Sequence, residues 1–239
     1  MALLALHAVG KSYGALKVTD DISLSVEEGE TLGILGPNGA GKTTLFNLIS
    51  GDVRVDTGRV EYEGRDVTAL KPNQRCHAGI GRSYQVPQPF GNMTVFENLV
   101  TAACFGAQQG EREAWQTAYE VLDQTGLMAH ANKPAGGLTL LNRKRLELAR
   151  ALATKPRLLL LDEIAGGLTE HEAKVLVDEL KRIKARGVTM IWIEHVVHAL
   201  LSLADRLFVI NFGQKLAEGA PQAVMADAEV RRVYMGIEA

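Results

Sequence analysis

Residues 36–43 of the chain read GPNGAGKT, which fits the pattern G-x-x-x-x-G-K-[ST]. An apolar run, Thr31–Leu35, precedes this stretch and a run with helical character, Thr44–Ser50, follows it. Glycines let the backbone wrap closely enough for its N–H groups to point at phosphate oxygens, and a helix N-terminus adds positive partial charge. The stretch therefore predicts a phosphate loop between a strand and a helix.

Individual residues of this phosphate loop receive distinct expected roles. Lys42 should hold the β- and γ-phosphates of a nucleotide, and the Thr43 hydroxyl should coordinate Mg²⁺. Further nucleotide contacts are expected from Gly36, Asn38, Gly39, Ala40, Gly41 and Thr44. The alternative is a glycine-rich turn with an incidental lysine, but the flanking strand and helix favour nucleotide binding. A nucleotide with Mg²⁺ is thus the expected ligand.

A second motif, LLLLDE at residues 158–163, supplies carboxylates. Four successive leucines are typical of a strand buried on both faces, and such a strand carries Asp162 to the carboxyl edge of the sheet, where ligands of open α/β sheets bind. We expect Asp162 to hold Mg²⁺, directly or through water. Glu163 is placed to accept a proton from an attacking water. The alternative is a pair of solvated carboxylates before a helix.

The rest of the chain alternates between two textures. Residues 1–84 and 156–239 carry short β-rich runs, whereas residues 92–155 are helical almost throughout. Strands are predicted near residues 3–9, 22–26, 31–35, 59–62, 157–161, 188–193 and 207–211, and residues 1–6 are expected at a sheet edge. The Thr169/Glu172 capping box opens a helix between two of these strands, and this order predicts a parallel sheet.

Three helices are predicted in the middle of the chain. Thr94 and Glu97 form a capping box that starts the first. The second places Trp115, Ala118, Tyr119 and Leu122 on one face and stops at Gly126, and the third runs from about Asn142 to Ala153. Residues from 221 to 234 predict two short helices.

Composition excludes several classes of protein. The 239 residues carry 26 Lys and Arg against 28 Asp and Glu, and the net charge of −2 argues against a nucleic-acid binder. Cys76 and Cys104 lack metal-ligand spacing and suggest reduced thiols in a cytosolic protein. No apolar run reaches the length of a membrane-spanning helix, and the first residues lack the features of a signal peptide.

The motifs together resemble those of the ATP-binding cassette (ABC) family, along essentially the whole chain. By this resemblance, Tyr13 matches the aromatic residue that stacks on adenine, Gln85 in RSYQVP matches the glutamine that senses metal and γ-phosphate, and His195 in IWIEH matches the switch histidine. Packing of Tyr13 on the sheet and a purely structural His195 are the alternatives. Glu163, His195 and Gln85 are thereby the expected catalytic residues, and Thr43, Gln85 and Asp162 the expected metal ligands.

The resemblance also implies the fold. It is an α/β fold with a P-loop NTPase (RecA-like) core, an antiparallel β subdomain and an inserted α-helical lobe. We expect a single ABC nucleotide-binding domain over residues 1–239. Its core and β subdomain would occupy residues 1–84 and 156–239, and its helical lobe residues 85–155.

Within the family, the chain is most similar to the ATPase subunits of branched-chain amino-acid importers. The similar stretches are residues 36–44, 81–99 and 145–153, and the ending VRRVYMG. Lipopolysaccharide-export ATPases are similar at several of these points. The resemblance implies transmembrane permease subunits, a second ATPase subunit in a head-to-tail dimer, and indirectly an external solute-binding protein. It places the chain peripherally at the cytoplasmic face of the inner (plasma) membrane.

The family's signature segment, usually LSGGQ, reads LTLLN here, at residues 138–142. Thr139 keeps a hydroxyl and Asn142 keeps an amide, so both remain expected nucleotide contacts, while leucine replaces both glycines. A leucine Cβ restricts close backbone approach to a γ-phosphate. The change favours a hetero-pair with a related ATPase over a homodimer, and it leaves a non-hydrolysing, nucleotide-regulated module as an alternative. Three cations follow, at residues 143–145. The two interpretations are a solvated basic face of the helix and a contact with the nucleotide of the partner subunit.

Overall fold

The computed structural model describes residues 2–235 of the chain, which form two compact units. Unit 1 comprises the residues up to Pro72 and those from Thr189 onward, and unit 2 is Asn73–Val188. The predicted helical lobe, residues 85–155, lies inside unit 2. Unit 2 also contains two strands and a further helix that the sequence analysis assigned to the core.

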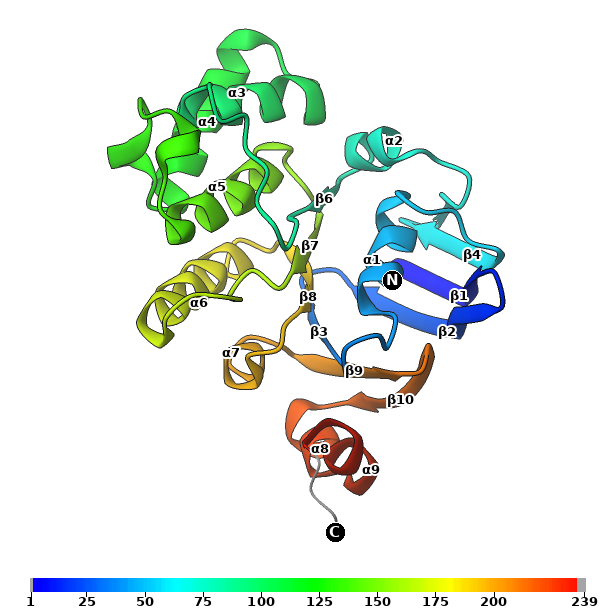
Figure 1. Ribbon diagram of the computed structural model, residues 1–239. Helices are drawn as coiled ribbons and strands as arrows, with labels where there is room; N and C mark the ends of the chain where they lie inside the picture. Colours follow the sequence, from blue (N-terminus) through cyan, green and yellow to red (C-terminus); the bar gives the residue numbers. More distant parts are fainter. Residues whose placement is uncertain (1, 236–239) are drawn as a thin grey trace. The chain divides into compact units, whose positions relative to one another are not determined.

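Unit 1 contains an antiparallel sheet with the strand order β2-β1-β4-β5. These strands are β1 (Ala2–Tyr13), β2 (Leu16–Glu27), β4 (Thr57–Tyr62) and β5 (Arg65–Asp66), and the first three lie side by side in Figure 1. Leu4 of β1 pairs with Val26 of β2 and with Tyr62 of β4. The expectation of an edge strand at residues 1–6 was therefore wrong for residues 2–6, which the structure describes. The apolar pattern of a single strand does not show whether its backbone pairs with a neighbour on one side or on both.

A second sheet in unit 1 carries the phosphate loop. Its strands are β3 (Thr31–Leu35), β8 (Thr189–Ile193), β9 (Arg206–Asn211) and β10 (Gln214–Gly219), in the order β10-β9-β3-β8. The central strand β3 runs parallel to β8 and β9, while β10 returns antiparallel to β9. Every residue of β3 and β8 is buried, as the continuous apolar runs predicted.

Helices complete unit 1. They are α1 (Lys42–Ser50), α7 (Val197–Leu201), α8 (Pro221–Ala226) and α9 (Ala228–Val230), followed by a π-helical turn at Arg231–Met235. The two short helices predicted near the end of the chain are confirmed. Gly236, the last residue of the VRRVYMG stretch, lies outside the described residues.

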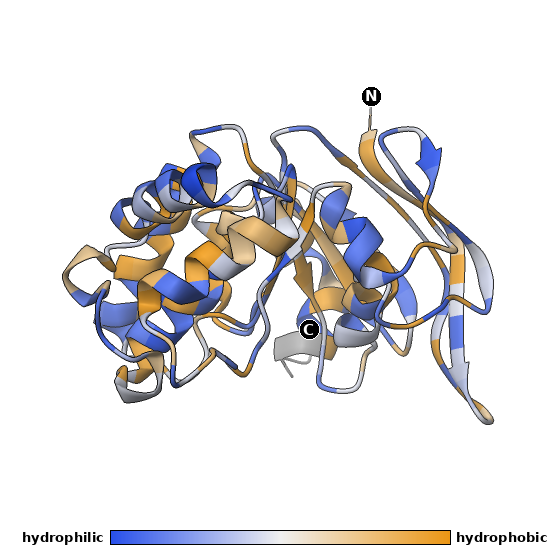
Figure 2. Ribbon diagram, turned by 90° about the horizontal axis from the view of Figure 1, so that it is seen from above, coloured by the Kyte–Doolittle hydropathy of each residue, from blue (hydrophilic) through white to orange (hydrophobic). Residues whose placement is uncertain are grey.

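Unit 2 pairs two parallel strands, β6 (Ile80–Arg82) and β7 (Leu158–Asp162). Its helices are α3 (Val95–Gly106), α4 (Glu111–Gln124), α5 (Leu140–Ala153) and α6 (Glu170–Lys184), with α2 (Pro72–His77) at its boundary and short 3-10 turns at Met128–His130 and Ala135–Gly137. Apolar and polar residues alternate along these helices in Figure 2, as expected where one side faces a core. Both predicted capping boxes form, at Thr94/Glu97 and at Thr169/Glu172.

Helix α4 buries a different face from the one predicted. Its buried residues are Ala114, Thr117, Ala118, Val121 and Leu122, so Trp115 and Tyr119 did not belong to the buried stripe. These two residues are 54% and 59% exposed. Trp115 instead packs edge-on against Phe96 of α3, with ring centroids 5.6 Å apart. The small residues Ala114 and Ala118 lie on the packed face of α4 because they allow closer packing. The prediction was wrong because it placed the buried face by the size of the aromatic side chains.

Candidate functional site

The phosphate loop connects the buried strand β3 to helix α1. Lys42 begins α1, and its side chain is buried. Its Nζ donates hydrogen bonds to the carbonyl oxygens of Gly36 at 2.8 Å and Pro37 at 3.0 Å, so the ammonium lies back along the loop. Thr43 is exposed and Thr44 half-buried. The two residues assigned to phosphates and Mg²⁺ thus follow one another at the start of a helix.

At two positions of the loop, Gly36 and Gly41, the neighbouring backbone leaves no room for a Cβ atom. A Cβ on Gly36 would lie 2.2 Å from the carbonyl oxygen of Ile210, and a Cβ on Gly41 would lie 2.4 Å from that of Val18. Gly41 also caps α1 with φ of 103°, a left-handed conformation that other residues rarely adopt. The backbone can therefore wrap closely only with glycine at these positions.

The N-terminus of α1 is open to an anion. No side chain caps it in the described structure, and the N–H groups of a first helical turn have no intrahelical partner. The helix is nine residues long, and its aligned peptide dipoles place positive partial charge at this end. Together with the Lys42 ammonium, this geometry suits a polyphosphate.

The steric role of Gly41 can be separated from its backbone conformation. Gly39 also has positive φ, but its Cβ would meet nothing within 4 Å. We expect Gly39→Ala to lower the free energy of unfolding by about 1–2 kcal/mol, the cost of a left-handed alanine. Gly41→Ala should cost about 1–3 kcal/mol more, because the added methyl is forced against Val18. Urea unfolding of both variants measures the difference, and equal losses would show that the close approach to Val18 does not constrain the loop.

Unit 1 also holds the other two predicted contacts. Tyr13 ends β1, with its ring half exposed and the Lys11 ammonium 5.5 Å from the ring centroid. His195 follows β8 and is exposed. Its backbone N–H donates to Oε1 of the buried Glu194 at 3.1 Å, which fixes the backbone just before the imidazole.

Unit 2 brings together the carboxylate pair and the glutamine. Asp162 ends β7 with only 3% of its surface exposed, and the Arg82 guanidinium lies 3.3 Å from its Oδ2. The neighbouring Glu163 has φ of 47° and accepts a hydrogen bond at its Oε2 from Nε2 of Gln85, at 2.5 Å. The side chains expected to hold metal and to activate water therefore meet at the end of one strand.

The donors assigned to Mg²⁺ are all oxygen atoms. They are the carboxylate of Asp162, the amide oxygen of Gln85 and, in unit 1, the hydroxyl of Thr43. Mg²⁺ prefers hard oxygen ligands and is usually held by one or two carboxylates together with substrate phosphates, so this donor set fits the ion. Within residues 2–235 no group of three or more His, Cys, Asp or Glu side chains is arranged to hold a metal.

The altered signature segment forms the start of α5. Thr139 is the N-cap and its hydroxyl accepts from the backbone N–H of Asn142. Leu140 and Leu141 are already helical, and Leu140 is exposed. The Asn142 side chain is held on both sides, because its Oδ1 accepts from Arg145 Nη1 at 3.4 Å and its Nδ2 lies 3.1 Å from Nε2 of His130. The helix begins two residues earlier than predicted, at the position that Thr139 caps.

The three cations that follow the signature have three different environments. Arg143 is exposed and donates to the carbonyl oxygen of Gly136 at 2.8 Å. Lys144 is buried and directed at backbone carbonyls of unit 2, and Arg145 forms an ion pair with the buried Glu179 of α6. Only the first of them fits a solvated basic face. The sequence analysis did not predict the roles of Lys144 and Glu179. A charged residue next to the apolar face of a predicted helix can nevertheless indicate a buried charge that needs a polar partner.

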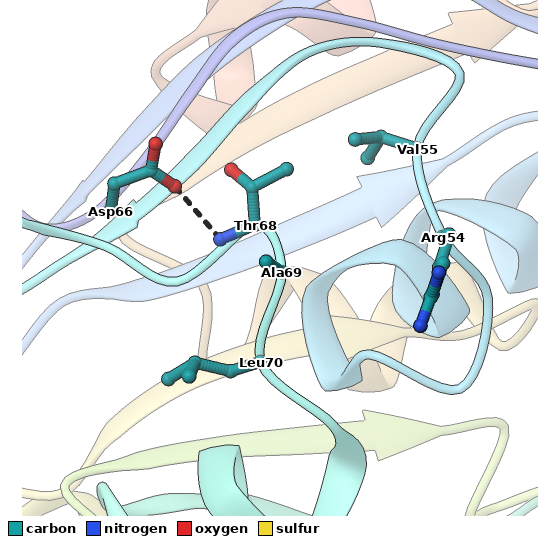
Figure 3. A pocket seen from close by; sticks show the side chains of 6 residues that line it. All are labelled: Arg54, Val55, Asp66, Thr68, Ala69 and Leu70. Carbon is teal, nitrogen blue, oxygen red and sulfur yellow. Dashed lines mark hydrogen bonds between the residues drawn. The ribbon is translucent and has the colours of Figure 1, made fainter.

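A cavity of about 510 Å³ lies elsewhere in unit 1. Figure 3 shows its lining, in which the backbone N–H of Thr68 donates to the Asp66 carboxylate at 2.8 Å. The other lining residues are Arg54, Val55, Ala69 and Leu70. None of the predicted site residues is among them. As to membrane insertion, none of the helices within residues 2–235 combines the length and apolar character that crossing a bilayer demands.

Comparison with known proteins agrees with these motifs. The family described as "ABC transporter" matches residues 19–166, more than half of the chain. A second family, "Branched-chain amino acid ATP-binding cassette transporter", matches residues 214–239. A probable ABC transporter ATP-binding protein of Azorhizobium caulinodans is 37% identical over 98% of this chain and 83% of its own.

Two further relatives and a solved structure align over nearly full length. The probable branched-chain amino acid transport ATP-binding protein LivG of Methanocaldococcus jannaschii is 33% identical, covering 99% of this chain and 98% of its own. The lipopolysaccharide export system ATP-binding protein LptB of Haemophilus influenzae has the same identity and coverages. The ADP conformation of an ATP-binding cassette of an ABC transporter superposes with a TM-score of 0.89 at 33% identity, covering 99% of this chain and all of the other.

The expected α/β fold, with a P-loop NTPase core and an antiparallel sheet, is therefore confirmed. The phosphate loop, the carboxylate pair at the end of β7, the family match and the structural likeness all agree. The chain belongs to the ABC transporter family and is an ATPase of that family.

Proposed function

We propose that this ABC ATPase powers the import of branched-chain or related amino acids. The match of residues 214–239 to the branched-chain amino-acid family carries this proposal, since it concerns the end of the chain rather than the motifs that all ABC ATPases share. Relatives named LivG, in Methanocaldococcus jannaschii and Salmonella typhimurium, support it at 33% identity each.

In the proposed site, the phosphate loop holds ATP. Backbone N–H groups of residues 36–44 and the Lys42 ammonium bind the phosphates, and the Tyr13 ring stacks on adenine. Mg²⁺, bound by Thr43, Asp162 and Gln85, would neutralise charge on the phosphates. The exposed position of Thr43 and the open N-terminus of α1 support this assignment.

Hydrolysis is proposed to depend on Glu163 as general base. Its carboxylate takes a proton from the attacking water, while Gln85, hydrogen-bonded to it, orients the carboxylate and responds to the γ-phosphate. His195 is proposed to contact the γ-phosphate from its exposed position after β8. Most of the rate enhancement comes from positioning and charge neutralisation, as in other phosphoryl transfers.

We further propose a dimer of two ATPase subunits. Thr139 and Asn142 of this chain would face the nucleotide on a second subunit. Between them, the backbone at Leu140 and Leu141 is helical and does not adopt the left-handed conformation that glycine would allow. Leucine side chains restrict close approach at this half-site, so the partner is expected to be a related ATPase with glycines there. Transmembrane permease subunits and, indirectly, an external solute-binding protein complete the complex at the cytoplasmic face of the inner membrane. Nucleic acid has no role in it.

The test is transport by the assembled complex. The full chain would be purified with its membrane subunits and partner ATPase, and reconstituted in liposomes with the external binding protein. Radiolabelled leucine, isoleucine or valine should accumulate when ATP is supplied on the side of the ATPase, and the same amino acids should stimulate phosphate release. Accumulation of none of them, with ATPase stimulation by lipopolysaccharide instead, would contradict the proposal.

Lipopolysaccharide export is the second candidate function. It is favoured by the relatives named LptB, which are 33% and 35% identical in Haemophilus influenzae and Acidithiobacillus ferridurans. A non-hydrolysing, nucleotide-regulated module, suggested by the altered signature, is tested by phosphate release from the purified chain and its complex. Sustained release excludes it.

A further inference from the structure

Lys144 is a buried cation directed at the backbone of the proposed catalytic residues. It lies in the second turn of α5 with 5% of its surface exposed. Its Nζ donates to the carbonyl oxygen of Glu163 at 3.0 Å and approaches that of Gln85 at 3.5 Å. An ammonium has three donors and loses hydration on burial, so carbonyl oxygens are the partners that make this position tolerable.

The two carbonyls belong to residues whose side chains also meet. Gln85 Nε2 donates to Glu163 Oε2, so Lys144 closes a ring of contacts that joins the backbones of both residues to α5. The Glu163 carbonyl additionally accepts from the backbone N–H of Gly166 at 3.2 Å. Glu163 itself has φ of 47°, a conformation that costs a non-glycine residue energy and persists only where its surroundings enforce it.

The same side of α5 holds the residues around Gln85. Glu147, one turn after Lys144, accepts backbone hydrogen bonds from Tyr84 and Gln88, and Arg150 Nη1 donates to the Gln88 carbonyl oxygen at 2.9 Å. Burial raises the pKa of Glu147, against the opposing charge of Arg150 3.2 Å away. Positions 144, 147 and 150 are spaced by three residues and therefore lie on one side of α5, the helix that begins with the signature segment. This side of α5 holds the segment 84–88 through hydrogen bonds.

We infer that Lys144 is a positioning residue that fixes Glu163 and Gln85 relative to the signature helix. The inference rests on the proposed role of Glu163 as general base. Lys144 touches neither nucleotide nor water in this role: it acts through the backbone of the residues that do. Because it lies two residues after Asn142, a displacement of the signature segment is transmitted directly to the backbone of the base through this side chain, alongside the contacts that Glu147 and Arg150 make with residues 84–88.

Steady-state kinetics of the purified chain, or of its complex, tests the inference. Lys144→Met keeps the length and apolar stem but removes the donors, and it should lower kcat for ATP hydrolysis by about tenfold to a hundredfold, the cost of a misplaced catalytic group. The KM for ATP and the affinity for a fluorescent ATP analogue should stay unchanged. Lys144→Arg, which retains charge and donors, should recover most of kcat. Lys181→Met removes an exposed lysine of α6 and should change neither constant.

Hydrogen–deuterium exchange provides a readout that needs no hydrolysis. In Lys144→Met, peptides covering residues 160–168 and 83–88 should exchange faster, because the Glu163 carbonyl and its bond to Gly166 lose a restraint, while peptides from β9 should not change. A wild-type kcat with unaltered exchange would overturn the inference. So would a joint change of kcat and KM that Lys144→Arg fails to rescue, since it indicates a merely structural role. Failure of the base assignment is distinguishable: Glu163→Gln would then hydrolyse ATP normally while faster exchange in Lys144→Met still reported the restraint.

Discussion

Glu163→Gln is expected to lower kcat for ATP hydrolysis by about 10²–10⁴-fold, the usual contribution of a general base. An amide cannot take the proton from the attacking water. The rest of the geometry should persist, because glutamine matches glutamate in shape and its carbonyl oxygen can still accept the hydrogen bond from Gln85 Nε2. Arg82 and Asp162, which form the neighbouring ion pair, are untouched. Affinity for ATP should therefore stay within about twofold of wild type, a difference of less than 0.5 kcal/mol.

Phosphate release and equilibrium binding of a fluorescent ATP analogue measure the two quantities separately. Glu170→Gln is the matched control, because it makes the same chemical change at an exposed carboxylate in the first turn of α6. Its kcat should equal that of wild type. Steady-state hydrolysis by Glu163→Gln at the wild-type rate would remove Glu163 from the role of base and leave the proposed mechanism without one.

The sequence predicted those features that depend on short stretches of chain. The phosphate loop, both capping boxes and the buried strands β3, β7 and β8 are each encoded within about ten residues, where turn chemistry and hydrophobic periodicity act directly. Gln85 was identified only through the family resemblance, and its hydrogen bond to Glu163, 78 residues further along the chain, was not predicted. Nothing local in either residue indicates the other.

The different environments of the three cations after the signature segment could not be predicted from the sequence. Arg143, Lys144 and Arg145 are adjacent and chemically alike, yet one is exposed, one is buried against carbonyls and one is paired with Glu179. The difference arises because successive helix positions point about 100° apart, so each faces a different neighbour. The partners of Lys144 lie 59 and 19 residues away along the chain and the partner of Arg145 lies 34 residues away, which a local pattern cannot reveal.

Glu179→Ala should lower the free energy of unfolding by about 3–5 kcal/mol, the cost of breaking a buried ion pair from one side. Glu179 is 3% exposed, and both its oxygens accept from Arg145, with Nε 3.3 Å from Oε2 and Nη2 on Oε1. Removing the carboxylate leaves the guanidinium without its charge partner. It also releases Asn142, which Arg145 holds through Nη1, so the signature segment should loosen together with the junction of α5 and α6.

Burial raises the pKa of Glu179 although the hydrogen bond and charge of Arg145 oppose the shift, so desolvation outweighs the attraction of the pair. The folded state thus holds this proton more tightly than the unfolded chain does, and the contribution of Glu179 to stability falls as pH rises above its ordinary pKa. For the same reason, replacing both partners, as in Arg145→Met with Glu179→Leu, should restore most of the lost stability and flatten the pH dependence.

Urea unfolding at several pH values measures these effects, and Asp178→Ala is the matched control. Asp178 is the neighbour of Glu179 on α6, but its pair with Lys181 is exposed, so its loss should cost less than about 1 kcal/mol. If Glu179→Ala were no more destabilising than Asp178→Ala, the pair would not hold α5 against α6. If the double variant were as unstable as Glu179→Ala alone, the loss would come from packing rather than from an uncompensated charge, and the assignment of Arg145 as a structural partner would fail.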